Sequence, residues 1–93
     1  MPVLKIPTPL RYYTDGKAEV SVQGANVGAA MQDLVAQYPT LETHLYSGSG
    51  ELRAFVNLFL GENNIRDLQG LATPLQAGDT LRLIPSIAGG IGR

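Results

Sequence analysis

The sequence predicts an α+β domain in which one main helix packs on one face of a mixed sheet of four to five strands. Apolar and polar residues alternate as in strands near both ends of the chain, at 3–6 and 80–85. A segment of strong helical periodicity lies between them, at 27–38. The chain has 93 residues. It therefore forms one small domain with a modest core, and we expect no deep catalytic cleft beside that core.

Two strands near the N-terminus are expected from alternating residues. The first covers 3–6, where Lys5 stands between two apolar residues, and the second covers 18–22. Asp15-Gly16, a dipeptide typical of tight turns, precedes the second strand. These features predict an N-terminal hairpin whose strands are joined by a long connection.

The main helix is expected between Asn26 and Pro39. Asn26 is a suitable N-cap, because its side-chain oxygen can accept a hydrogen bond from a free backbone N–H. Pro39 ends the helix, since proline disfavours the helical conformation of the residue before it. Between them, apolar residues recur at the spacing of one helical face, which predicts an amphipathic helix of about three turns. These residues are Val27, Ala30, Met31, Leu34, Val35 and Tyr38.

Two more strands are expected in the second half of the chain. The apolar run at 52–60 predicts the longest strand, and 80–85 predicts the last one, after a turn at Gly78-Asp79. Asp67-Leu68 is expected in a single helical turn. The order strand, strand, helix, strand, irregular piece, strand suits a β-grasp fold over 1–86. The predicted core consists of Leu4, Ile6, Val20, Val22, Met31, Leu34, Val35, Val56, Leu58, Leu81 and Leu83.

Composition excludes several classes of function. The absence of cysteine excludes disulfides, thiolate nucleophiles and cysteine-based metal sites. His44 is the only histidine, so we expect no metal site. A net charge of -1 does not match the basic surface of a nucleic-acid binder. The chain has no apolar run of membrane-spanning length and no signal peptide at its start. We therefore expect a cytoplasmic protein with no nucleic-acid or membrane partner.

Three stretches of the sequence resemble a known family. They are IPTPLRYYT at 6–14, FVN and IRDLQGLATPLQAGD within 55–79, and TLRLIPSIAGG at 80–90. Together they resemble the small ubiquitin-like sulfur carriers: the small subunit of molybdopterin synthase, the thiamine-pathway carrier and the carrier of the thiocarboxylate-dependent cysteine pathway. The resemblance is greatest to the cysteine-pathway carrier and covers nearly the whole chain.

The resemblance implies a carrier that acts through Gly89-Gly90 and is not itself an enzyme. An E1-like adenylating enzyme would activate the Gly90 carboxylate with ATP, and a sulfur nucleophile would displace AMP to leave a thiocarboxylate. Such a group explains how a chain without cysteine could carry sulfur. A second enzyme, either cysteine synthase-like or the large subunit of molybdopterin synthase, would accept the sulfur. The carrier itself is expected to bind no cofactor.

The segment 87–93 is expected to be a flexible tail. Ala88 and Gly89 are small and would let this tail enter a narrow channel in a partner enzyme. Mature family members end at the second glycine, whereas Ile91-Gly92-Arg93 follow Gly90 here. We expect a protease, by analogy a zinc metalloprotease of the deubiquitinase type, to remove these three residues. The alternatives are that the chain never enters this chemistry or that the residues were added by cloning.

Alternation also predicts a docking patch on the outer face of the sheet. If Leu83 faces the core, then Arg82 and Ile84 face outward. The same alternation places Phe55 and Phe59 outward on the preceding strand. Exposed aromatic residues on a small domain are typical of a docking site, so these four residues are the predicted partner-binding surface. The alternative is that the phenylalanines pack beneath the irregular segment that follows their strand.

Three other functions remain open. The chain could be the small subunit of molybdopterin synthase, which a stably bound large subunit would favour. It could be a ubiquitin-like modifier, which isopeptide bonds from Gly90 to lysines of other proteins would favour. It could also be a noncatalytic interaction domain whose terminus is never activated.

Overall fold

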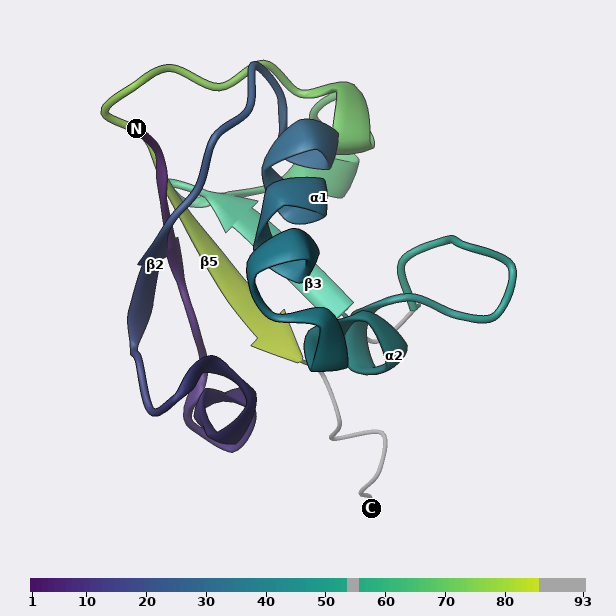
Figure 1. The fold of residues 1–93 in the computed structure, drawn as a ribbon. Helices are drawn as coiled ribbons and strands as arrows, with labels where there is room; N and C mark the ends of the chain where they lie inside the picture. The colour runs from purple at the N-terminus through teal and green to yellow at the C-terminus, as the bar shows by residue number, and fades with distance from the viewer. Residues whose placement is uncertain (54–55, 86–93) are drawn as a thin grey trace.

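The computed structural model describes residues 1–53 and 56–85. Five strands form one mixed sheet, and the main helix, α1 (Val27–Gln37), lies across one of its faces (Figure 1). The strands are β1 (Val3–Lys5), β2 (Glu19–Ser21), β3 (Val56–Leu60), β4 (Asn63–Asn64) and β5 (Thr80–Pro85). Their spatial order is β2-β1-β5-β3-β4. This is the β-grasp arrangement that the sequence predicts.

β5 is the central strand of the sheet. It pairs in parallel with β1 and antiparallel with β3, and its bounds are those predicted from the sequence. β1 and β2 pair antiparallel, which confirms the predicted hairpin. The long connection between them contains a 3-10 segment, η1 (Thr8–Thr14), that was not predicted.

The core lies between α1 and the sheet. The side-chain oxygen of Asn26 accepts a hydrogen bond of 2.8 Å from the backbone N–H of Ala29, so the predicted N-cap is confirmed. The helix ends at Gln37, before Pro39, as predicted. Every predicted core residue is buried except Val35, which is partly buried and packs against the core.

The predicted strand at 52–60 is confirmed only in part. Among the described residues of this run, Val56–Leu60 form β3, whereas Leu52 forms an isolated bridge with Tyr46. Residues 54–55 lie outside the described residues. Within the described ranges β3 has 5 residues and β5 has 6, so β3 is not the longest strand there.

Two further helical pieces lie between α1 and β3. η2 (Pro39–Leu41) and α2 (Glu42–Leu45) follow α1 directly, and each buries one leucine, Leu41 and Leu45. Neither piece was predicted. After β4, the 3-10 turns η3 (Ile65–Asp67) and η4 (Gly70–Ala72) lead to β5, and η3 confirms a helical turn near Asp67. Within the described residues, no helix has the length and apolar character needed to cross a membrane.

Candidate functional site

The tail follows directly from the best-anchored strand of the sheet. β5 has hydrogen-bonded neighbours on both sides, and the side chains of Leu81 and Leu83 are buried. Its last residue, Pro85, lies opposite Val56 of β3. Pro85, the last described residue before the tail, is therefore held in place at the end of β5 (Figure 1). The predicted tail residues Ala88, Gly89 and Gly90, and the predicted docking residue Phe55, lie outside the described residues.

The outer face of the sheet, opposite α1, carries the other predicted docking residues. Arg82 and Ile84 of β5 alternate with the buried leucines, and they are exposed as predicted. Cross-strand pairs place Phe59 beside Arg82 and Asn57 beside Ile84. Directly opposed residues share one face of a sheet. The register therefore brings Arg82, Ile84 and Phe59 together, and we call these three residues with Asn57 the outer-face patch.

Phe59 is partly buried, and the side chain of Arg82 on the neighbouring strand lies over its ring. The guanidinium carbon of Arg82 lies 5.7 Å from the centre of the Phe59 ring, which is a cation–π distance. Nη2 of Arg82 also donates to the Gly61 carbonyl at 3.2 Å. The Arg82 guanidinium is thus held over the aromatic ring. The patch has two apolar residues, Phe59 and Ile84. Ile84 is the more exposed of the two, at 40%.

Hydrogen bonds orient the polar side of the outer-face patch. Arg66 donates from Nη1 to Oδ1 of Asn57 at 3.1 Å and from Nη2 to the Val56 carbonyl at 3.1 Å. Nδ2 of Asn64 donates to the same Asn57 oxygen at 3.3 Å. These contacts hold the Arg66 guanidinium against Asn57, so the patch has a second positive charge beside that of Arg82 on β5. The patch therefore combines an exposed apolar side chain with positive charge, which suits a partner surface that is apolar and acidic.

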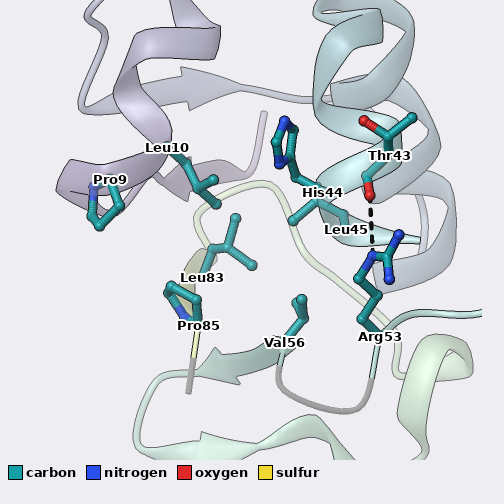
Figure 2. Close-up of a pocket in the computed structure, with 9 residues that line it drawn as sticks. All are labelled: Pro9, Leu10, Thr43, His44, Leu45, Arg53, Val56, Leu83 and Pro85. Atoms are coloured by element: carbon teal, nitrogen blue, oxygen red, sulfur yellow. Dashed lines mark hydrogen bonds between the residues drawn. The ribbon is translucent and has the colours of Figure 1, made fainter. Parts of the chain in front are cut away.

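A pocket of about 350 Å³ lies on the other side of the tail's origin (Figure 2). Its walls come from η1 (Pro9 and Leu10), from residues 43–45 of α2 and from the end of β5. Val56, Leu83 and Pro85 also line it. We call this hollow the tail-side pocket; Arg53 completes its rim.

The tail-side pocket could not be predicted from sequence patterns, because three distant segments build it. Side chains near η1 and α2 have the following surroundings. Arg11 is paired locally, since its Nε donates to the Ile6 carbonyl at 3.0 Å. Of the adjacent tyrosines, Tyr12 is exposed and Tyr13 packs against the core. His44 is exposed, and its ring centre lies 4.2 Å from that of Tyr13.

The His, Asp and Glu side chains of the described residues are dispersed. Across residues 1–53 and 56–85 there is no group of three or more His, Cys, Asp or Glu side chains that could hold a metal ion. Asp79 is used in a turn, where its carboxylate accepts from the backbone N–H of Gln76 at 2.8 Å, as predicted.

The sheet order and single main helix define a small ubiquitin-like β-grasp domain. The model of the ThiS family matches residues 4–90, and the chain therefore belongs to the ThiS family. The sulfur carrier protein CysO of Mycobacterium tuberculosis (strain ATCC 25618 / H37Rv) is 38% identical over 89 residues, which cover 94% of this chain and 96% of that protein. The resemblance to the cysteine-pathway carrier is thereby confirmed.

Solved structures confirm the β-grasp fold. The crystal structure of M. tuberculosis CysO matches with a TM-score of 0.84 and 35% identity, over 92% of this chain and 99% of that one. The Amycolatopsis orientalis BexX/CysO complex contains a chain that matches with a TM-score of 0.87 and 30% identity, over 97% and 100% of the two chains. Small archaeal modifier protein 1 of Haloferax volcanii is 39% identical over 72 residues, 76% of this chain and 78% of that protein.

Proposed function

We propose that this protein is a sulfur carrier, activated at Gly90 and delivering a thiocarboxylate to a biosynthetic enzyme of the cysteine pathway. The observation that carries the proposal is the ThiS-family match, which runs through Gly90 and continues directly from the anchored strand β5. The similarity to CysO of M. tuberculosis supports the cysteine pathway. ATP-dependent activation would take place in the cytoplasm.

The distance between Pro85 and Gly90 fits this role. Five extended residues span at most about 18 Å. The terminal carbonyl can therefore reach a buried catalytic centre while the folded domain stays outside the enzyme. Glycines at the end of such a segment allow the backbone to approach reacting groups closely, because they have no Cβ.

The chemistry needs an activated carboxylate, because a free carboxylate is a poor acyl donor. An E1-like partner would join the Gly90 carboxylate to the α-phosphorus of ATP, with pyrophosphate as the leaving group. A sulfur nucleophile supplied as sulfide would then attack the acyl carbon, and AMP would leave with the bonding electrons. The product is a Gly90 thiocarboxylate, which a sulfur-accepting enzyme would use.

Binding of the tail requires further contacts from the domain. Ordering five tail residues costs about 5–10 kcal/mol at 1–2 kcal/mol per residue. We infer that the partner recovers this cost by docking on the outer-face patch, with Ile84 as the apolar contact and Arg82 as the charge. Ala88, the residue before the glycine pair, is small enough to pass through the same channel.

Gly90 must become a terminus before it can be activated. In a chain that continues with Ile91-Gly92-Arg93, the Gly90 carbonyl is an amide and offers no carboxylate for adenylation. We infer that a processing metalloprotease cuts after Gly90. Among the residues that the structure describes, the buried core lies between Leu4 and Leu83, which is upstream of the proposed cut.

The test compares the full-length chain with a chain that ends at Gly90. Each is incubated with the cognate activating enzyme, ATP and sulfide, without protease, and its mass is measured. Only the Gly90-terminated chain should gain a thiocarboxylate. Equal thiolation of the full-length chain at Arg93 would overturn the processing step, and no thiolation of either chain would overturn the sulfur-carrier proposal.

A second candidate function is protein modification, which the similarity to small archaeal modifier protein 1 favours. The same activated Gly90 would then form an isopeptide bond with a lysine of a target protein. Mass spectrometry of native-cell proteins separates the two functions. Gly90 linked to lysines would support the modifier, whereas a free Gly90 thiocarboxylate supports the carrier.

A further inference from the structure

We propose that the tail-side pocket is a second docking site for the enzyme that activates the carrier. In this proposal the pocket receives an apolar side chain of the enzyme, and an acidic residue next to that side chain pairs with Arg53. The inference rests on the proposed function, because it requires an enzyme that takes up the tail.

The position of the pocket supports this role. Pro85 is the last described residue before the tail, and it lines the pocket together with Leu83. The next residue along β5 after Leu83, Ile84, points to the opposite face of the sheet. The pocket and the outer-face patch therefore lie on the two sides of the tail's origin. An enzyme channel that closes around the tail must contact both sides.

The size and lining of the pocket indicate what it can hold. A volume of about 350 Å³ is at the small end of the range for ligand pockets, so it fits one or two side chains rather than a nucleotide. The floor is apolar: Leu45 and Leu83 are buried core residues, and Leu10 packs against the core. Figure 2 shows Leu10, Leu45 and Leu83 pointing into the same hollow. An apolar side chain would complete the packing there.

The rim supplies the charge. Nε of Arg53 donates to the Thr43 carbonyl at 3.0 Å, which fixes the guanidinium at the edge of the pocket (Figure 2). None of the lining residues is acidic. In the part of the chain that the structure describes, the ion pair found is Lys5–Glu19, and Arg53 has no carboxylate partner. Its remaining N–H groups are thus available to an acidic residue of the enzyme, and His44 adds a further polar group on the rim.

The test measures ATP–pyrophosphate exchange by the cognate activating enzyme, with the Gly90-terminated chain as the varied substrate. Arg53→Glu should raise KM about tenfold and Arg53→Gln about threefold, with kcat unchanged, because a rim charge acts mainly on association. Lys17→Glu is the matched control. It makes the same change in net charge at an exposed residue that does not line the pocket, and its KM should stay within about twofold of wild type.

Arg53→Gln separates charge from structure. In this variant the amide Nε2 takes the place of the arginine Nε and can still donate to the Thr43 carbonyl, so the charge is removed while the donor is kept. A merely structural role would therefore leave its KM unchanged. Thr43→Glu, on the exposed rim, places a carboxylate beside an intact Arg53 and should also raise KM if Arg53→Glu fails to fold. Leu10→Ser tests the apolar half and should raise KM about fivefold.

Four results would overturn the proposal. One is an equal KM for Arg53→Glu, Thr43→Glu and Lys17→Glu, and another is an unchanged KM for Leu10→Ser. The third is self-association of the wild-type chain that Arg53→Glu abolishes in sedimentation, since a second copy would then occupy the pocket. The last is a failure of the wild-type chain to support exchange, which would refute both the proposed function and this inference. If the wild-type chain supports normal exchange and the variants keep its KM, only the docking role of the pocket is refuted.

Discussion

Leu83 and Ile84 are adjacent in β5 but point to opposite faces of the sheet, so truncating each to alanine tests the division between core and docking face. Leu83 is 2% exposed, whereas Ile84 is 40% exposed. Leu83→Ala removes buried methyl groups and leaves a cavity, which costs about 2–5 kcal/mol of unfolding free energy. Burying a whole isoleucine side chain is worth about 1.5–3 kcal/mol. Ile84→Ala, at a partly exposed site, should therefore cost about 1 kcal/mol.

Urea unfolding of the Gly90-terminated chain measures this difference. A change of 1 kcal/mol shifts the melting temperature by roughly 4–8 °C in a domain of this size, so thermal melting should rank the two variants in the same order. The effect on function should be reversed. Ile84→Asp should raise KM in ATP–pyrophosphate exchange more than Leu83→Ala does, at a temperature where both variants are folded. Because Ile84 is not fully exposed, Ile84→Asp should cost more than the about 0.5 kcal/mol typical of a free surface site.

Two outcomes would refute this reasoning. If Ile84→Ala destabilised the domain as much as Leu83→Ala, the outward orientation of Ile84 would be wrong. If Ile84→Asp left KM unchanged while the domain stayed folded, Ile84 would lie outside the docking surface.

Three other residues give independent predictions. Gly24→Ala should lower the free energy of unfolding by more than about 1 kcal/mol, because its new Cβ would lie 2.5 Å from the Ala30 backbone nitrogen; Gly78→Ala, whose Cβ would have nothing within 4 Å, is the control, and equal stability of the two variants would contradict the close packing. Gly89→Trp in the Gly90-terminated chain should abolish exchange without changing the melting temperature, and normal exchange would rule out a narrow channel. Burial, reinforced by the charge of Glu42, raises the pKa of Tyr46 above its ordinary 10.0 in the folded state. The unfolded chain then ionises first, so the stability from the neutral phenol is complete below pH 10 and declines as the pH rises towards the folded-state pKa. Tyr46→Phe should flatten this alkaline decline, and parallel curves for the two proteins would contradict the shift.

The parts of the fold that local patterns determine could be predicted. The main helix has a cap, a periodic apolar face and a terminating proline, and β5 alternates over its full length. Local patterns did not show where the strand begins within the run at 52–60. Its apolar residues resemble one long strand, but Leu52 bridges to Tyr46, whereas Val56–Leu60 pair with β5. Which residues pair depends on contacts distant in sequence.

The same limit applies to the candidate site. The outward orientation of Arg82 and Ile84 follows from the period of a strand, so it was predicted correctly. The contact of the Arg82 guanidinium with the Phe59 ring depends on the register between β3 and β5. The sequence alone does not fix that register. The tail-side pocket needs η1, α2 and the end of β5 together, and the first two were not predicted at all.

The most direct test of the sulfur-carrier function is the intact mass of this protein isolated from its native cells. The proposed function predicts a chain that ends at Gly90, in which one oxygen of the terminal carboxylate is replaced by sulfur. Gly90-terminated chains should also be present in the unmodified form, as the substrate of the activating enzyme. A population that consists only of chains ending at Arg93, with no sulfur added, would contradict activation at Gly90.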